Sequence, residues 1–310
     1  MGFAKKILLI VVPLFFISCV SDTAKKANKE FDSQDTTSIA ESKQGEKALD
    51  ETKDMVDHMV DNLGSPIETV AMIKSLGIPF NSTLLAPNGE TDTFTSSYQQ
   101  ATALGIYGAD LGYLNFYGKT SLVLSYIATV KTLADELKVG QFFDYSTLKR
   151  LANNNENVDS LIYISRKSMN RIDQYLRKTQ RSSISAAIVT GVWVEGMYYM
   201  TQFYKISKKE RLKEAIGDQK ALVNLLINVL KNYSYHPEIK ELYNELLGIA
   251  NIYKNVSISV VQNGDPEMVE VNGVYTVIQN EKTVINISQK QIDEITSKIM
   301  QIRSKLLGDS

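Results

Sequence analysis

Apolar side chains recur every three or four positions along most of the chain, which is the spacing of helices that bury one face. Glycine, proline and clusters of small polar residues interrupt this spacing and mark helix ends. Ser288 and Gln291 form a capping box that starts the last helix. The pattern predicts helices over residues 47–62, 66–76, 96–117, 120–138, 145–151, 158–178, 182–206, 207–231, 237–255 and 289–306. The expected fold is mainly α, a multi-helix bundle.

The spacing changes to an alternation near the C-terminus. Residues 269–277 alternate between apolar and polar side chains around an Asn-Gly pair, the strongest short-range signal for a two-residue hairpin turn. Residues 283–287 are a candidate third strand. We therefore expect a small β-hairpin or meander within about residues 256–287, before the last helix.

The N-terminal segment has the three parts of a bacterial lipoprotein signal. Lys5 and Lys6 give it a basic start, and residues 7–17 are apolar but too short to span a bilayer stably. Ser18 then precedes Cys19, as the small residue of a lipobox does. Cys19 is the only cysteine, so the chain cannot form an internal disulfide. We predict cleavage after residue 18 and lipidation of Cys19.

This signal divides the chain into three expected parts. The residues after the cysteine are mostly Ser, Thr, Lys, Gln, Asp and Glu, with too little apolar surface to offset the entropy of ordering them. We expect a lipoprotein signal peptide at 1–18, a flexible polar tether at 19–45 and a single helical domain at 46–310.

The residues that follow Cys19 bear on sorting within the envelope. Val20 stands where an aspartate would resemble a signal for retention in the inner membrane. Asp22 is followed by Lys25 and Lys26 instead of the acidic cluster that surface-exported lipoproteins tend to carry. The expected location is the outer membrane, facing the periplasm.

Charge and composition argue against several classes of function. The chain has 34 basic and 35 acidic side chains, and loss of residues 1–18 would leave 32 basic against 35 acidic. Without a basic stripe, no nucleic-acid partner is expected. The two histidines lie on separate segments without metal-ligand spacing, and no phosphate loop or dinucleotide fingerprint follows a strand. We expect no metal and no cofactor.

The stretch 104–117 departs from the pattern of a surface helix. On a helical wheel, one stripe carries Gly105, Gly108, Ala109, Gly112 and Phe116. Glycine in a helix costs about 0.5–1 kcal/mol relative to alanine, so three glycines on one side need a structural reason. We expect a second helix to pack closely on this stripe at the centre of the bundle. Gly108→Leu should then destabilise the fold.

A second unusual stretch spans residues 191–202. Trp193 and Met197 lie on a face that we assign to the core. The opposite face carries Gly191, Glu195, Tyr198, Tyr199 and Gln202. Beside the stripe of the first stretch lie Asp110, Tyr113 and Tyr117. If Gly191 and Gly196 let the two helices approach closely, two carboxylates and four tyrosines come into one neighbourhood.

Three interpretations of this neighbourhood stay open. Carboxylates and tyrosine faces attract cations, by roughly 0.5–2 kcal/mol for each ring, which favours a pocket for a small polar or cationic ligand. Asp110 and Glu195 would alternatively act as an acid–base pair. The third interpretation is a buried structural network in which the carboxylates pair with a basic side chain. The candidate basic partners are Arg166, Arg171 and Lys131.

Three features together resemble a family of Bacteroidota lipoproteins: the lipobox, Tyr107–Tyr113 with the sequence YGADLGY, and Gly191–Tyr198 with the sequence GVWVEGMY. The resemblance covers roughly residues 95–205 and continues more weakly to the C-terminus. That family often has two glycines before the tryptophan, whereas Gly191-Val192 keeps only one. Since no activity is assigned to the family, the resemblance implies an envelope location and a helical architecture, and it supplies no catalytic residues.

The sequence therefore predicts an envelope lipoprotein with a helical domain that binds a ligand or another protein. Its expected partners are the membrane, through the lipid on Cys19, and either an envelope protein or a small polar or cationic ligand. The alternative from another class is a hydrolase or lyase that uses a buried pair of carboxylates, Asp110 and Glu195. The direction in which those two side chains point distinguishes the hypotheses.

Overall fold

The computed structural model describes residues 66–308, apart from 90, 153–157, 272–273 and 279. All described residues fall within one compact unit. The predicted signal peptide, Cys19, the tether and the helix expected at 47–62 lie outside the described residues.

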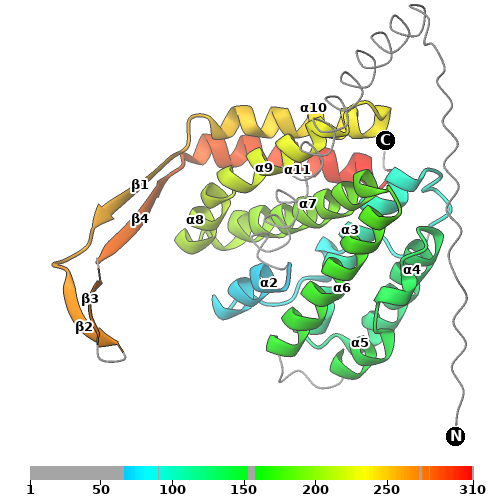
Figure 1. Ribbon diagram of the computed structural model, residues 1–310, viewed down its shortest axis with the longest axis horizontal. Coiled ribbons are helices and arrows are strands. Elements are labelled where there is room, and N and C mark those ends of the chain that lie inside the picture. Colours follow the sequence, from blue (N-terminus) through cyan, green and yellow to red (C-terminus); the bar gives the residue numbers. More distant parts are fainter. Residues whose placement is uncertain (1–65, 90, 153–157, 272–273, 279, 309–310) are drawn as a thin grey trace, which may run out of the picture. The chain divides into compact units, whose positions relative to one another are not determined.

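The described part of the chain is mainly helical, as predicted (Figure 1). Its helices are α2 (Pro66–Ser75), α3 (Ser97–Phe116), α4 (Thr120–Glu136), α5 (Tyr145–Ala152), α6 (Val158–Lys178), α7 (Ser182–Ser207), α8 (Glu210–Asp218), α9 (Lys220–Asn232), α10 (Pro237–Tyr253) and α11 (Gln289–Leu306). Ser288 and Gln291 form the predicted capping box at the start of α11, and Ser96 forms another with Gln99 at the start of α3.

One predicted helix is wrong. The segment expected as a single helix at 207–231 forms two helices, α8 and α9, which meet at Gln219. The side chain of Gln219 accepts a hydrogen bond from the indole N–H of Trp193 at 3.1 Å. The break lets α8 pack beside β4 while α9 packs against α10. Gly217, two residues before the break, is the local signal for it, and a Cβ there would collide with the side chain of Ile285 on β4.

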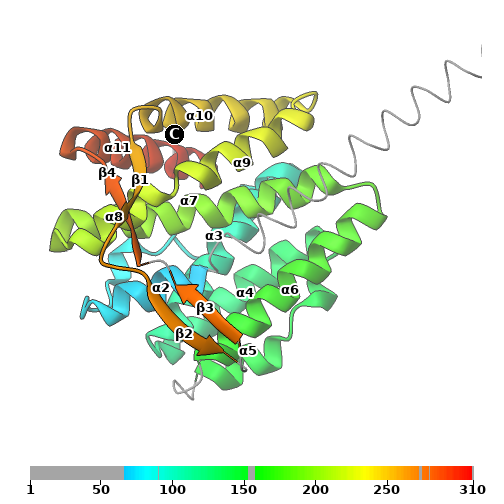
Figure 2. The ribbon, with the colours of Figure 1, turned by 60° about the vertical axis from the view of Figure 1, so that its left-hand side comes forward.

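The core is built around α3 and α7, which contact each other more extensively than any other pair of described helices. In α3, 15 of the 20 residues are buried, so this helix is covered by other elements around most of its circumference. α7 is likewise buried along most of its length. The prediction of a central helix at this place is therefore confirmed. Helices α10 and α11 lie side by side at one edge of the bundle (Figures 1 and 2).

Two of the predicted glycines, Gly105 and Gly191, explain how closely α3 and α7 approach. A Cβ atom on Gly105 would collide with the carbonyl oxygen of Ile188 and lie 2.7 Å from the backbone nitrogen of Val192. A Cβ on Gly191 would collide with the carbonyl oxygen of Thr102. The two backbones therefore touch at Gly105 and Gly191.

Two other glycines of the predicted contact do not take part in it. A Cβ on Gly108 or on Gly196 would meet no atom within 4 Å. The expectation that Gly108→Leu overpacks a helix–helix seam is therefore wrong. Gly108 instead faces a cavity, which is described below.

The strands form two antiparallel pairs between α10 and α11. They are β1 (Ser257–Gln262), β2 (Glu267–Val271), β3 (Val274–Ile278) and β4 (Glu281–Asn286). β2 pairs with β3 on either side of the predicted Asn-Gly turn, whose two residues lie outside the described ones. The predicted third strand exists as β4, but it pairs with β1 and does not extend the hairpin. Figure 1 shows these strands reaching out from the ends of the two helices.

Candidate functional site

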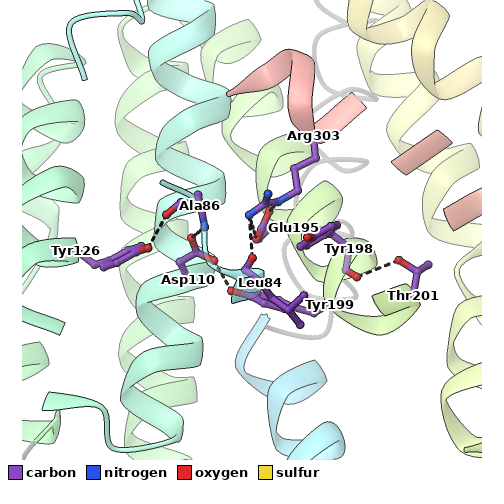
Figure 3. Close-up of polar contacts among 9 residues, drawn as sticks. All are labelled: Leu84, Ala86, Asp110, Tyr126, Glu195, Tyr198, Tyr199, Thr201 and Arg303. Atoms are coloured by element: carbon purple, nitrogen blue, oxygen red, sulfur yellow. Dashed lines mark hydrogen bonds and ion pairs between the residues drawn. The ribbon is translucent and has the colours of Figure 1, made fainter. Parts of the chain in front are cut away.

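The contact between α3 and α7 places the two predicted carboxylates in the same buried region. Figure 3 shows Asp110 on α3 and Glu195 on α7 within this region. Both residues are 0% exposed. Their neighbours are Tyr199 on α7, Arg303 on α11, and the backbone of Leu84 and Ala86 in the loop before α3. These six residues are called the buried network below.

Glu195 is held by Arg303. The arginine Nε donates to Glu195 Oε2 at 2.6 Å, and its Nη2 donates to Glu195 Oε1 at 2.9 Å. The same Nη2 donates to the carbonyl oxygen of Leu84 at 3.0 Å. The guanidinium lies 4.1 Å from the ring centroid of Tyr198, a cation–π arrangement. Burial lowers the pKa of Arg303, but the Glu195 carboxylate outweighs it and holds that pKa above its usual range.

The basic partner predicted from the sequence was wrong. Arg166 pairs with Glu68, and Lys131 pairs with Asp135 on its own helix. Arg171 is exposed.

A signal for the true partner was present in the last helix. Arg303 follows directly on an apolar stripe made by Ile292, Ile295, Ile299 and Ile302. A charge next to such a stripe must be buried with an opposite charge, because an unpaired buried guanidinium is strongly unfavourable.

Asp110 is held without a direct basic contact. Its Oδ2 accepts the backbone N–H of Ala86 at 2.9 Å, and its Oδ1 accepts the hydroxyl of Tyr199. Burial, followed by the charge of Glu195, raises the pKa of Asp110 well above its usual range, although Arg303 and the two hydrogen bonds act in the opposite direction. Burial and the nearby Asp110 also raise the pKa of Tyr199, so this hydroxyl remains a donor.

The raised pKa of Asp110 predicts a dependence of stability on pH. Because its pKa is higher in the folded state, its contribution is fully present below the ordinary value near 4 and is lost as the pH rises through the raised value. Asp110→Asn removes this titration and keeps an acceptor for the N–H of Ala86. The free energy of unfolding of the wild type should therefore fall, relative to that of the variant, as the pH rises above about 4. Urea titrations across this range check it, and a constant difference would contradict it.

Three further tyrosines form hydrogen bonds with the loop before α3. The hydroxyl of Tyr126 donates to the carbonyl oxygen of Ala86 at 2.5 Å. The hydroxyl of Tyr113 accepts the N–H of Asn81 at 2.8 Å, and the hydroxyl of Tyr117 donates to the carbonyl oxygen of Ile78 at 2.8 Å. A partly buried loop needs such partners for its backbone groups. The predicted residues Tyr113 and Tyr117 thus hold the loop, and neither hydroxyl bonds to Asp110.

The other predicted residues differ in their relation to the network. Tyr198 is half-buried and covers the guanidinium of Arg303. The ring centroids of Tyr113 and Tyr199 lie 4.6 Å apart, which joins these two residues by packing. Gln202 is buried, and its Nε2 has no hydrogen-bond partner among the described residues. Of the predicted set, the structure therefore brings Asp110, Glu195, Tyr198 and Tyr199 together near Arg303.

A separate cavity of about 90 Å³ lies beside α3, next to the part of its glycine stripe that follows Gly105. Gly108, Ala109 and Gly112 form its wall on α3, and the rest of the lining is predominantly apolar. The other lining residues are Leu104, Leu111, Asn115, Val130, Phe143, Leu148, Ile164, Ser165, Ser168, Met169, Ile188 and Val192. The sequence pointed to this stripe, but the small residues there leave space open where a helix contact was expected.

Among the residues that the structure describes, no group of three or more His, Cys, Asp or Glu side chains is arranged to hold a metal ion. None of the helices described is both long and apolar enough to cross a membrane.

Comparisons of the chain with protein-family models, with characterised proteins and with solved structures gave no match. The resemblance to Bacteroidota lipoproteins therefore stays a prediction.

Proposed function

We propose that the protein is a lipid-anchored protein of the outer membrane, facing the periplasm, whose helical domain binds a small, mainly apolar molecule in the cavity beside α3. The observation that carries the binding proposal is the cavity itself, with its predominantly apolar lining. The anchor is supported by the lipobox at Cys19 and the apolar segment before it.

The burial of both carboxylates weighs against the hydrolase or lyase alternative. A general acid or base must reach the reacting atoms directly or through one water molecule. Asp110 and Glu195 are 0% exposed, and their oxygens already accept hydrogen bonds from Tyr199, Ala86 and Arg303. Their arrangement is that of a structural network, which joins α3, α7, α11 and the loop before α3.

The cavity favours an apolar ligand over the cationic one expected from the sequence. No acidic or basic side chain is among its lining residues. Its volume of about 90 Å³ is several times the roughly 10–15 Å³ that one water molecule needs, but it is smaller than the roughly 150 Å³ of an enclosed apolar cavity that holds benzene. The cavity is partly open to solvent, so a small ring would contact its apolar lining without being fully enclosed. A cation placed there would lose its hydration without gaining an opposite charge.

Toluene is a suitable first probe for this proposal. Met169 lines the cavity. Adding toluene should therefore shift the ¹³C resonance of the Met169 methyl group, and the shift should saturate. Met300 is an exposed methionine on α11 and serves as the internal control, whose methyl signal should not move. An unchanged Met169 signal up to the solubility limit of toluene would remove the support for a ligand site here.

A variant that fills the cavity gives the matched test. A side chain at position 108 meets no atom within 4 Å at its Cβ, so Gly108→Leu should fold and extend into the cavity. Its melting temperature should stay level or rise, because leucine also has the higher helix propensity, by about 1 kcal/mol. Toluene should no longer shift the Met169 signal in this variant.

The anchor makes an independent prediction. Cys19→Ser removes the only thiol to which a lipid can be attached at the lipobox. The variant should lose labelling by radioactive palmitate and move from the membrane fraction to the soluble fraction of the envelope. If the variant still sediments with outer membranes, the lipid anchor is wrong, although the ligand proposal is unaffected.

A further inference from the structure

The cavity contains one polar side chain whose hydrogen bonding is incomplete. Asn115 of α3 is 1% exposed and lines the cavity. Its Nδ2 donates to the carbonyl oxygen of Leu111 at 3.0 Å, one turn earlier in the same helix. Its Oδ1 is buried and has no hydrogen-bond partner among the described residues. The bond to Leu111 fixes the orientation of the amide, so the unpaired atom is an acceptor.

An unpaired buried acceptor is unusual enough to need an explanation. Buried side-chain oxygens nearly always have a partner, because removing an oxygen from water without a replacement is unfavourable. Ser165 and Ser168 also line the cavity, but a serine hydroxyl can donate or accept. Asn115 alone among the polar lining residues therefore presents a fixed requirement, which is a hydrogen-bond donor.

We propose that the cavity binds a neutral apolar molecule that carries one hydrogen-bond donor, a hydroxyl or N–H group, and that Asn115 Oδ1 accepts the hydrogen bond from it. The inference rests on the proposed function, since it specifies the ligand class for the same cavity. The donor is neutral because the lining residues include no carboxylate to offset an ammonium group. A small apolar body fills the space beside Gly108 and Gly112, and its donor meets Asn115.

Phenol and toluene test this inference, because they have similar size and shape and only phenol has a donor. Their dissociation constants are measured from the Met169 methyl shift in the wild type and in Asn115→Leu. Leucine has a similar size but no acceptor. The ratio of the toluene to the phenol dissociation constant should be about tenfold higher in the wild type than in the variant, as expected for one hydrogen bond to a buried acceptor.

The variant is expected to fold. It replaces a partly unsatisfied buried amide with an apolar side chain, and the carbonyl of Leu111 is left with the main-chain hydrogen bonding of the helix. Its melting temperature should therefore be equal to or higher than that of the wild type. If it does not fold, the side-chain amide signals of Asn115 in the wild type give a second measurement. Phenol should shift them strongly, and toluene should shift them weakly.

The outcomes separate this inference from the proposed function. If both probes bind but the ratio is the same in the wild type and in Asn115→Leu, or phenol leaves the Asn115 amide signals in place, the donor requirement is wrong and the ligand site remains. If neither probe binds the wild type, the ligand site itself is wrong, and the inference fails with it.

Discussion

Glu195→Ala is expected to destabilise the helical domain by about 3–5 kcal/mol, the usual effect of removing one partner of a buried ion pair. The variant leaves the guanidinium of Arg303 buried, beside the carbonyl of Leu84, the ring of Tyr198 and the nearby carboxyl of Asp110, which it does not contact directly. For a domain of about this size, 1 kcal/mol corresponds to roughly 2–4 °C, so the melting temperature should fall by roughly 6–20 °C. Thermal and urea unfolding followed by circular dichroism measure the effect.

A matched control comes from an exposed ion pair in the same domain. Arg166 and Glu68 join α6 to α2, and their side chains are 44% and 38% exposed. Glu68→Ala should change stability by no more than about 1 kcal/mol, because solvent screens exposed pairs. The double variant Glu195→Leu with Arg303→Met should be less destabilised than either single replacement, since it removes both charges. Equal effects of Glu195→Ala and Glu68→Ala would contradict a structural role for the buried network.

Gly105→Ala is expected to produce the second large effect. The added methyl group would collide with the carbonyl oxygen of Ile188 and press on the backbone nitrogen of Val192, neither of which is a flexible side chain. Overpacking usually costs about 1–3 kcal/mol, and a contact with backbone on both sides should place this variant at or above the upper end. The gain in helix propensity, about 1 kcal/mol, does not compensate.

Gly108→Ala gives the comparison within the same helix. Here the same methyl group meets no atom within 4 Å, so helix propensity acts alone. Its stability should rise by up to about 1 kcal/mol, opposite in sign to the effect at Gly105. If both variants were stabilised, α3 and α7 would not be in backbone contact. If both were destabilised, the space beside Gly108 would be filled.

Local signals in the sequence were enough to predict most of the helices. The capping box at Ser288, the helix ends and the close approach of two glycine-containing helices follow from patterns within a few turns. The break at Gln219 has only one local signal, Gly217, and its cause is the packing of α8 and α9 against different neighbours. The partner of β4 was missed for a similar reason, since β1 precedes it by about 20 residues.

The candidate site was predicted in part. The carboxylates and their tyrosines were identified from the two helical wheels, but the partner of Glu195 lies 108 residues away on α11. A wheel for a single helix cannot show such a contact. Asn115 lies three residues after Gly112, yet its importance depends on an unpaired atom, which only the three-dimensional arrangement reveals.

We propose that a small molecule binds in the cavity beside α3 and that the carboxylates only stabilise the fold. The most direct measurement is the affinity of toluene for Asp110→Asn compared with Gly108→Leu, read from the Met169 methyl signal. The expected result is wild-type affinity within about twofold for Asp110→Asn, a difference well under 1 kcal/mol, and no binding to Gly108→Leu. Loss of binding in Asp110→Asn together with its retention in Gly108→Leu would contradict the claim.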